Sequence, residues 1–232
     1  MTADEQKQAA GETAAVLIDD VEVVGLGSGS TAGYFIRAVA QRVREHNLAG
    51  RQFVPTSIGS AALARSLNLP LIDLDYVGRV DLTVDGADEV GPGLSLIKGG
   101  GAALLREKLV WEASDRCVVI VDAGKQVERL GAFPLPIEVV SFGHALTARR
   151  IDEVLKAQGI EADPILRLQF GSPVRTDGGN LIYDVACGVI ENPAALASAL
   201  KSITGVVEHG LFLNLADGAL IGTDDGVIAL QP

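Results

Sequence analysis

The sequence predicts an α/β fold, in which a parallel sheet carries helices on both faces and a smaller α+β domain contains an antiparallel sheet. Helical stretches alternate with short apolar runs from residue 1 to about residue 130, which is typical of parallel strands joined by helices. One run, CVVIV (117–121), is apolar throughout, as expected for a strand covered on both faces. After residue 131 the alternation gives way to strands joined partly by a glycine-rich turn.

The elements of the first domain follow from these runs. We expect helices over residues 4–20, 31–46, 59–67 and 101–114. We expect strands in the runs VEVVGLG (21–27), RQFVPTS (51–57), VDLTVDGADE (80–89) and RCVVIVD (116–122). Ligands of parallel sheets bind beyond the carboxyl ends of the strands, so the loops after these runs are the first candidates for a site.

The pattern changes at the segment GAFPLP (131–136). Beyond it we expect strands at 136–140, 164–170 and 181–186, and helices at 143–158 and after Asn192 and Pro193. The turn TDGGN (176–180) favours antiparallel pairing. The last short strands are expected to return to the first sheet. The predicted division is a Rossmann-like catalytic domain of residues 1–130 with 207–232, and a small α+β domain of residues 131–206.

Composition excludes several classes of protein. The 232 residues include 19 Lys and Arg against 30 Asp and Glu, which gives a formal net charge of −11. Such a field repels nucleic acid and acidic membrane surfaces. With 48% hydrophobic and 21% charged residues, the chain can bury a core, and disorder is not expected. The first twenty residues carry Asp4 and Glu5 instead of the pattern of a signal peptide, and no run approaches the length of a membrane span.

The cysteines and histidines favour neither a disulfide nor a zinc site. Cys117 and Cys187 lie 70 positions apart in apolar runs, which favours free thiols in a reducing cytoplasm. His46, His144 and His209 are far apart and lack the spacing of zinc ligands. We therefore expect a cytoplasmic protein whose histidines are structural or solvated.

The first candidate site is the glycine-rich segment GLGSGST (25–31), which follows an apolar run and opens a helix. Backbone N–H groups and the helix dipole can bind a phosphate there, and Ser28, Ser30 and Thr31 add hydroxyl donors. The segment lacks the lysine of a Walker loop, and Ser30 stands where a dinucleotide fingerprint needs its third glycine. A monophosphate is therefore favoured over a dinucleotide. The alternative is a tight strand-to-helix turn without a ligand.

Carboxylates mark the end of another predicted strand, in VDLTVDGADE (80–89). Asp85 ends the strand, and Asp88 and Glu89 lie on the loop beyond it. Asp85 and Asp88 are therefore placed where the chemistry of a parallel sheet is expected. The alternative is an acidic turn with a local capping role, which is the favoured interpretation for Glu89.

A glutamate on the apolar face of a predicted helix is the best candidate for a catalytic base. The neighbours of Glu107 one turn away on either side are all apolar: Ala103, Leu104, Val110 and Trp111. Arg106 and Lys108 flank it and are expected to point off this face. A carboxylate on an inward face is costly unless it is paired, and desolvation makes it a stronger base. A buried structural ion pair is the alternative.

Three lysines complete the candidate residues. The segment KGGG (98–101) before this helix supplies a cation, glycines that allow close approach and a helix N-terminus. Lys125 also follows a predicted strand, and Lys7 lies in the first predicted helix. A single lysine is usually solvated, but Lys98, Lys125 and Lys7 together can neutralise a phosphate.

Seven segments carry a resemblance to a known family. They are, in chain order, GLGSGSTA, TSIGSAALA, DLTVDGADEV, LIKGGGAALLREKLV, VDAGKQVERLG, FPLPIEV and RTDGGNLIYDV. In order and spacing the chain resembles ribose-5-phosphate isomerase type A over nearly its whole length. The resemblance implies reversible aldose–ketose conversion of D-ribose 5-phosphate to D-ribulose 5-phosphate in the non-oxidative pentose phosphate pathway. It also implies a homodimer or homotetramer that uses neither a metal nor a nucleotide cofactor.

The resemblance also implies roles for particular residues. Glu107 stands at the position of the catalytic base. Asp85, with Asp88, is implied to assist opening of the furanose ring, and Lys98 to stabilise the enediolate. The substrate-binding segments correspond to Ser28, Gly29, Ser30 and Thr31, to Asp85, Gly86, Ala87 and Asp88, to Lys98, Gly99, Gly100 and Gly101, and to Lys125 and Lys7. Ser28 departs from the family, which usually has threonine there, but it keeps the hydroxyl.

Two other functions stay open on the sequence. An acyl-CoA transferase on a related architecture uses a glutamate as its nucleophile, and a non-enzymatic sugar-phosphate sensor needs only the binding site. Sensors ordinarily carry an output module, and no helix-turn-helix segment or basic tail is evident here. Isomerase activity of the purified protein separates an isomerase from a sensor. Trapping of an acyl intermediate with hydroxylamine identifies a transferase.

Overall fold

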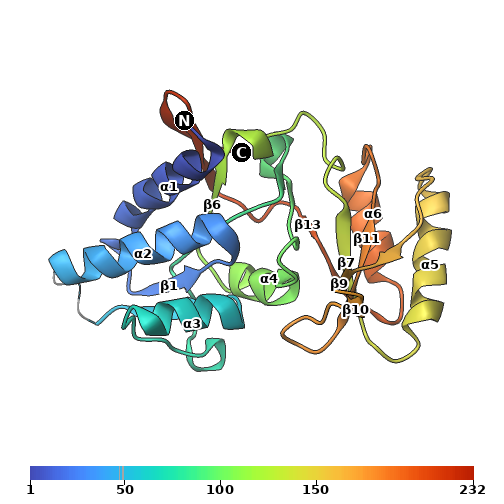
Figure 1. Cartoon of the computed structure of the whole chain (residues 1–232), viewed down its shortest axis with the longest axis horizontal. Helices are drawn as coiled ribbons and strands as arrows, with labels where there is room; N and C mark the ends of the chain where they lie inside the picture. Colours follow the sequence, from blue (N-terminus) through green and yellow to red (C-terminus); the bar gives the residue numbers. More distant parts are fainter. Residues whose placement is uncertain (47, 49) are drawn as a thin grey trace. The chain divides into compact units, whose positions relative to one another are not determined.

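The computed structural model describes residues 1–46, 48 and 50–232. Contacts group the chain into two compact units (Figure 1). Unit 1 consists of Met1–Ala87, Arg106–Gln126 and Asn214–Pro232, and unit 2 of Asp88–Leu105 and Val127–Leu213. The sequence placed residues 88–105, 127–130 and 207–213 in the first domain instead. A grouping by contacts does not test independent folding, so the predicted domain division stays a prediction.

Unit 1 is built on a six-stranded sheet with the strand order β15-β14-β6-β3-β1-β2. Its strands are β1 (Val23–Leu26), β2 (Gln52–Pro55), β3 (Leu82–Asp85), β6 (Cys117–Asp122), β14 (Gly218–Thr223) and β15 (Gly226–Leu230). Neighbouring strands run parallel except for β14 and β15, which form an antiparallel hairpin at the edge. The predicted return of the last strands to the first sheet is confirmed.

Helices cover both faces of this sheet, as predicted. They are α1 (Ala3–Ala14), α2 (Gly29–Glu45), α3 (Ile58–Ser66) and α4 (Leu104–Glu112), with 3₁₀ turns η1 (Ala15–Ile18), η2 (Leu74–Tyr76) and η4 (Ala123–Lys125). Side chains alternate along a strand, so adjacent residues report opposite faces. Phe53 of β2 packs in the cluster that contains the α2 residue Phe35, whereas Val54 packs with Val110 of α4.

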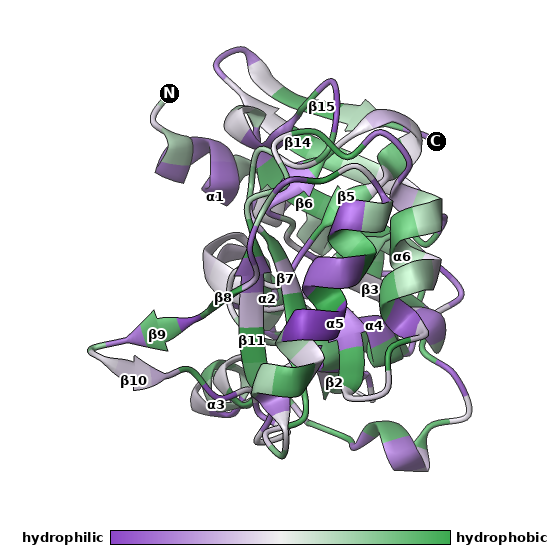
Figure 2. Cartoon of the chain, turned by 90° about the vertical axis from the view of Figure 1, so that its right-hand side faces the viewer, coloured by the Kyte–Doolittle hydropathy of each residue, from purple (hydrophilic) through white to green (hydrophobic). Residues whose placement is uncertain are grey.

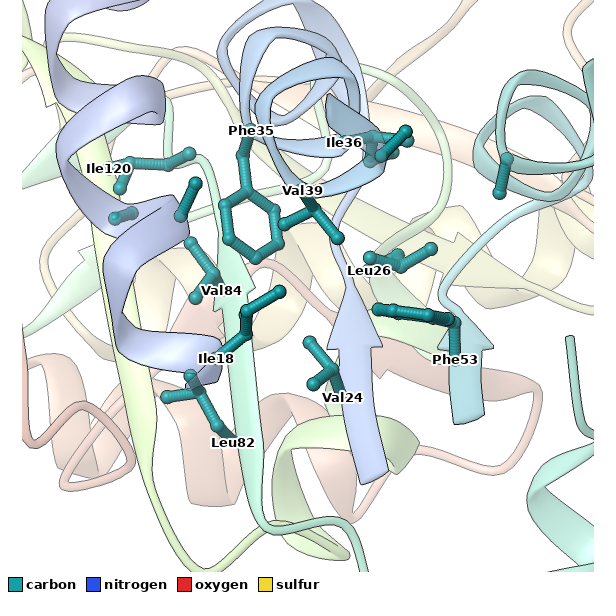
Figure 3. Close-up of a cluster of buried hydrophobic side chains, with 14 of the residues drawn as sticks. Ile18, Val24, Leu26, Phe35, Ile36, Val39, Phe53, Leu82, Val84 and Ile120 are labelled. Atoms are coloured by element: carbon teal, nitrogen blue, oxygen red, sulfur yellow. The ribbon is translucent and has the colours of Figure 1, made fainter. Parts of the chain in front are cut away.

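The main core of unit 1 lies between the sheet and helices α1 and α2. Its labelled members in Figure 3 are Ile18, Val24, Leu26, Phe35, Ile36, Val39, Phe53, Leu82, Val84 and Ile120. Each of these side chains is at most 1% exposed, and burial of a large apolar side chain contributes about 1.5–3 kcal/mol. This packing fixes the carboxyl ends of β1 and β3, where the candidate loops begin.

Unit 2 is built on antiparallel strands, as predicted. It contains a sheet of order β12-β7-β11-β8, a sheet of order β13-β5-β4 and the hairpin β9-β10. The strands are β4 (Glu89–Val90), β5 (Leu96–Ile97), β7 (Leu135–Val139), β8 (Ile165–Leu166), β9 (Leu168–Gln169), β10 (Ser172–Pro173), β11 (Leu181–Val185), β12 (Val206–His209) and β13 (Leu211–Phe212). Helices α5 (His144–Ala157) and α6 (Pro193–Lys201) and the turn η3 (Pro92–Leu94) complete it. Ile137, Ile151 and Leu196 belong to its core.

Several predicted elements are shorter or divided. The run expected as a strand over 80–89 divides into β3 and β4, which belong to different sheets. The helix expected over 4–20 ends at Ala14 and tightens into η1. The helix expected over 101–114 begins at Leu104, because Ala102 has a left-handed φ of +57° that does not fit a helix. The strand expected over 164–170 divides into β8 and β9, since β9 pairs with β10 rather than with β11. Among the described residues, no helix is long and apolar enough to cross a membrane.

Candidate active site

The glycine-rich segment joins β1 to α2 in unit 1. Ser28 is the N-cap residue of α2, and its side chain makes no capping hydrogen bond. Helices α1, α3 and α6, by contrast, are each capped by a side chain, those of Thr2, Ser57 and Asn192. The N–H groups of the first turn of α2 therefore lack a side-chain cap, and this leaves the turn suited to an anion.

The hydroxyl group of Ser28 is instead hydrogen-bonded to the two residues that follow β2, Thr56 and Ser57. Its Oγ lies 2.8 Å from Thr56 Oγ1 and 2.7 Å from Ser57 Oγ. Ser57 and Ser60 in turn form the capping box of α3. The orientation of Ser28 is thus set by the next strand and helix. The sequence did not reveal this network, because it joins residues about one βαβ unit apart.

Asp85 ends β3 and holds the same segment by its backbone. The residue is 0% exposed, and its Oδ1 accepts hydrogen bonds from the N–H groups of Ser28 and Gly86, both at 2.8 Å. A Cβ at Gly27 would lie 2.2 Å from this oxygen, so this close approach requires a glycine at 27. The fold therefore brings Asp85 and the glycine-rich segment together.

Glu107 lies in the first turn of α4 and is buried, at 5% exposure. The apolar residues one turn away on either side are buried too, as predicted: Ala103, Leu104, Val110 and Trp111. Arg106 is exposed, as expected, but the expectation that Lys108 points off this face is wrong, because it is 7% exposed. Residue 108 lies four positions after Leu104 and three before Trp111, so it shares their side of the helix.

Lys125 and Lys7 are both half-buried in unit 1. Lys125 ends the turn η4, whose first residue, Ala123, donates its N–H to Gln6 Oε1 at 3.2 Å. Gln6 Nε2 donates to Asp224 Oδ1 at 2.9 Å. Gln6 therefore ties helix α1, which carries Lys7, to the turn that carries Lys125. This role of Gln6 was not predicted from the sequence.

In unit 2, Lys98 follows β5 and is 2% exposed. Its backbone N–H donates to the carbonyl oxygen of Gly210 at 2.8 Å, and a Cβ at Gly210 would lie 2.2 Å from the Lys98 carbonyl oxygen. The ammonium nitrogen lies 5.5 Å from the centroid of the Phe212 ring, within the range of a cation–π interaction. Lys98 is therefore a buried, oriented cation.

Asp88 contacts the glycines that follow Lys98. Gly100 donates its N–H to Asp88 Oδ2 at 2.8 Å. Gly99 has a φ of +112°, and a Cβ there would lie 2.7 Å from the Leu104 side chain, so this position requires glycine. A Cβ at Gly101 would meet no protein atom within 4 Å. The segment is therefore tightly packed at 99 and 100 and open at 101.

Arg167 contacts the same segment from its carbonyl side and was not identified from the sequence. Its Nη1 donates to the carbonyl oxygens of Gly99 at 2.9 Å and Gly100 at 3.1 Å. The rest of its guanidinium group pairs with Asp184. These contacts join residues 68 positions apart, so no local spacing could have indicated them.

Glu89 has a structural role, as its sequence context favoured, but the expected loop position and local capping are wrong, because it begins β4 and its partners lie 42 and 44 positions away. It is 2% exposed. Its two carboxylate oxygens accept the N–H groups of Gly131 at 2.7 Å and Phe133 at 2.5 Å. Glu89 thus fixes the backbone at the point where the second domain was predicted to begin.

Both cysteines are free, as predicted. Burial raises the pKa of the Cys117 thiol to about 12 and that of the Cys187 thiol to about 11. Neither thiol is therefore a nucleophile at neutral pH. Within residues 1–46, 48 and 50–232, no group of three or more His, Cys, Asp or Glu side chains could hold a metal ion.

The candidate residues form two sets, one in each unit. Unit 1 holds the segment 28–31 against Asp85 and also carries Glu107, Lys125 and Lys7. Unit 2 holds Asp88 against the segment 98–101. Unit 1 thus supplies N–H groups for an anion and buried carboxylates for proton transfer, and unit 2 supplies a carboxylate and a buried ammonium for a developing negative charge.

Comparison with known proteins identifies the family. The family model of ribose 5-phosphate isomerase A (phosphoriboisomerase A) matches residues 52–226. Ribose-5-phosphate isomerase A of Caulobacter vibrioides is 62% identical over 232 residues, which cover all of both chains. A solved ribose 5-phosphate isomerase A from Methanocaldococcus jannaschii has a TM-score of 0.92 and 37% identity over the full length of both chains, and a solved D-ribose-5-phosphate isomerase in complex with phospho-erythronic acid gives the same values. The chain therefore belongs to the ribose 5-phosphate isomerase A family, whose members interconvert ribose 5-phosphate and ribulose 5-phosphate.

Proposed function

We propose that this chain interconverts D-ribose 5-phosphate and D-ribulose 5-phosphate in the non-oxidative pentose phosphate pathway, with Glu107 as the base. Membership of the family supports the reaction and speaks against the acyl-CoA transferase and the sensor. The burial of Glu107 on the apolar face of α4 carries the assignment of the base. A desolvated carboxylate is a stronger base toward a C–H group than a solvated one.

The reaction begins with opening of the furanose ring. Asp85, with Asp88, takes the proton from the hydroxyl at C1 and delivers a proton to the ring oxygen. The bond between C1 and the ring oxygen breaks, and the open-chain aldehyde forms. One oxygen of each carboxylate accepts a backbone N–H group, so the second oxygen of each is assigned to the proton transfer.

Proton transfer between carbons follows. Glu107 removes the proton from C2, and the electron pair forms a cis-enediolate with its negative charge on O1. A proton passes from O2 to O1, and Glu107 delivers its own proton to C1, which gives the ketose. Lys98 and the N–H groups of Gly99 and Gly101 stabilise the oxyanion, and preorganised donors of this kind commonly contribute about 3 kcal/mol each.

The phosphate is assigned to the first turn of α2 and to two lysines. Gly29, Ser30 and Thr31 supply N–H groups, and Ser30 and Thr31 hydroxyl donors, at a helix end without a side-chain cap. Ser28, whose N–H and hydroxyl are already hydrogen-bonded, orients this segment. Lys125 and Lys7 supply positive charge, and Gln6 ties their elements together. A phosphate at this position anchors the end of the substrate remote from C1 and C2, so its binding orients the reacting carbons.

The substitution Glu107→Gln tests the assignment of the base, because it keeps the shape of the side chain and removes its basicity. We expect kcat for ribose 5-phosphate to fall by about a hundredfold or more, while the affinity for phospho-erythronic acid is nearly kept. Glu112→Gln is the matched control, since Glu112 is an exposed glutamate on the same helix. A kcat near that of the unsubstituted protein would overturn the assignment.

We also propose that the chain is a cytoplasmic homodimer or homotetramer. Seven large apolar side chains among the described residues of unit 2 are exposed: Val140, Phe142, Leu146, Ile165, Leu168, Phe170 and Val189. Large apolar side chains exposed on a monomer are candidates for burial in a protein interface. Sedimentation at micromolar concentration should therefore give at least twice the chain mass of 24.1 kDa. A mass of one chain would overturn this proposal.

A further inference from the structure

We propose that Arg167, held by Asp184, is a positioning residue that sets the conformation of the segment 98–101 and the orientation of Asp88. This inference rests on the proposed function, in which that segment and Asp88 act on the substrate. Neither Arg167 nor Asp184 is assigned a contact with the substrate here. Both act through the backbone of the glycines.

The guanidinium group of Arg167 uses all three of its nitrogens. Nε donates to Asp184 Oδ2 at 2.7 Å and Nη2 donates to Asp184 Oδ1 at 2.5 Å. Nη1 donates to both glycine carbonyl oxygens, those of Gly99 and Gly100. The two paired side chains are 15% and 25% exposed. Because the planar fork of arginine is fixed on the carboxylate, the direction of Nη1 is fixed as well.

The fold accounts for this placement. Tyr183 pairs with Leu166 and Asp184 with Ile165 in the antiparallel β11 and β8, and the N–H of Arg167 donates to the carbonyl oxygen of Ile182. Asp184 therefore lies diagonally opposite Arg167 on the same face of the two strands, within reach of a long side chain. Figure 2 shows the β9–β10 hairpin, which follows β8 in the chain, extending away from β8 and β11.

We call the hydrogen bonds of Arg167 to Asp184 and to the carbonyl oxygens of Gly99 and Gly100 the Arg167 clamp. The clamp determines in which direction the N–H groups of Gly100 and Gly101 point. In a trans peptide the C=O and N–H groups point in opposite directions. The peptide between Gly99 and Gly100 is held at both ends, since its C=O accepts from Arg167 and its N–H donates to Asp88. In the next peptide the C=O of Gly100 points to Arg167, so the N–H of Gly101 points away from it.

Two consequences follow for the reaction. Asp88 and Arg167 bind the two ends of one peptide group, that between Gly99 and Gly100. Loss of Arg167 therefore frees the Gly100 N–H group, which orients the carboxylate of Asp88. The N–H of Gly101 is aimed from the open part of the segment, where a side chain would meet no protein atom within 4 Å. A donor that is aimed before the substrate binds costs no reorganisation during the reaction.

The test compares Arg167→Met with Arg129→Met. Arg129 also belongs to unit 2 and also pairs with a carboxylate, Glu191, but the two side chains of that pair are 65% and 77% exposed. We expect Arg167→Met to lower kcat/KM for ribose 5-phosphate by about tenfold or more and to weaken binding of phospho-erythronic acid by a similar factor. Arg129→Met is expected to change neither. Values within about twofold of the unsubstituted protein for Arg167→Met would overturn the proposal.

A second variant separates positioning from stability. Arg167→Lys keeps the charge and the stem but cannot hold two carbonyl groups and both Asp184 oxygens at once. We expect it to unfold at the same urea concentration as Arg129→Met and still to lose activity several-fold. If Arg167→Lys folds and has normal kinetics, the positioning role is overturned. This holds even if Arg167→Met fails to fold.

Gly101→Ala distinguishes failure of this inference from failure of the proposed site. The added methyl group meets no protein atom, so a rise in KM for this variant would place the substrate at the segment. If Gly101→Ala is impaired and Arg167→Met is normal, the clamp is wrong and the site stands. If both are normal, the segment 98–101 does not bind the substrate, and the proposed site fails with the clamp.

Discussion

The proposed mechanism gives the two carboxylate oxygens of Asp85 separate tasks. Oδ1 holds the N–H groups of Ser28 and Gly86, and proton transfer in the ring opening is assigned to Oδ2. An asparagine keeps an oxygen for the two N–H groups but cannot take up a proton. The structural and the chemical contributions of this residue can therefore be measured apart.

Asp85→Asn is expected to slow the reaction that starts from the ring form of ribose 5-phosphate more than the reaction that starts from ribulose 5-phosphate. Ribulose 5-phosphate cannot close a five-membered ring, because its O5 carries the phosphate, so its conversion to the enediolate needs no ring opening. We expect kcat for ribose 5-phosphate to fall by about a hundredfold. Exchange of the C1 proton of ribulose 5-phosphate with deuterium oxide, followed by NMR, should fall much less.

Glu107→Gln provides the comparison for this experiment, because removal of the base should abolish both the isomerisation and the exchange. If Asp85→Asn also loses exchange to the same extent, Asp85 acts in the step between the carbons or holds the site together. Such a loss of exchange would refute a role of Asp85 in ring opening alone.

The environment of a residue could be predicted from the sequence where it depends on neighbours in the same helix or strand. It could not be predicted where it depends on contacts with residues far away in the sequence. The burial of Glu107 could be predicted because its neighbours one helical turn away are apolar, and that pattern can be read without knowledge of the fold. Arg167 and Gln6 act on backbone groups 68 and 117 positions away. Nothing near either residue in the sequence distinguishes it from a solvated side chain.

At the scale of elements, Asp81 joins the beginnings of two neighbouring strands. It lies just before β3, and its Oδ2 accepts the N–H groups of Val23 and Glu22 at the start of β1, both at 2.8 Å. These bonds, that of Val23 first, hold the pKa of Asp81 below its ordinary value. The ionised carboxylate therefore stabilises the pairing of β1 and β3, whose other ends carry the candidate loops.

Asp81→Asn is expected to destabilise the protein at neutral pH but not in acid. Asparagine keeps a neutral acceptor, so the cost should be about 1 kcal/mol. Because the folded-state pKa lies below the unfolded value of about 3.9, the contribution of the charge is present above that value and is lost as the pH falls through the folded pKa. Urea unfolding from pH 7 downward measures the difference. A difference that does not shrink in acid would contradict this account.

Element types followed from periodicity, but element ends depended on backbone geometry. The apolar runs at 21–27 and 116–122 correctly predicted β1 and β6. The start of α4 was placed three residues too early, because the left-handed φ of Ala102 does not fit a helix and the hydropathy pattern does not reveal it. The division of the strand at 164–170 depended on a hairpin partner, β10. Pairing of that kind is not encoded in the alternation of a single run.

At the scale of the whole molecule, the charge of the protein and the charge of its substrate have the same sign. The chain carries a formal net charge of −11, and the substrate is a dianion. The cations assigned to it are few, Lys98, Lys125 and Lys7. Attraction must therefore be local, since an exposed charge is largely screened beyond a Debye length of about 8 Å at physiological ionic strength.

Salt should consequently have little effect on catalytic efficiency. Added salt screens the repulsion between the acidic protein and the substrate, and this offsets weaker attraction by the lysines. We expect kcat/KM for ribose 5-phosphate to stay within about twofold as sodium chloride is raised from roughly 0.02 M to 0.2 M. Sulfate and phosphate buffers are avoided, because they compete for an anion site. A fall of about tenfold would show that the positive field of the lysines extends into solvent and governs encounter.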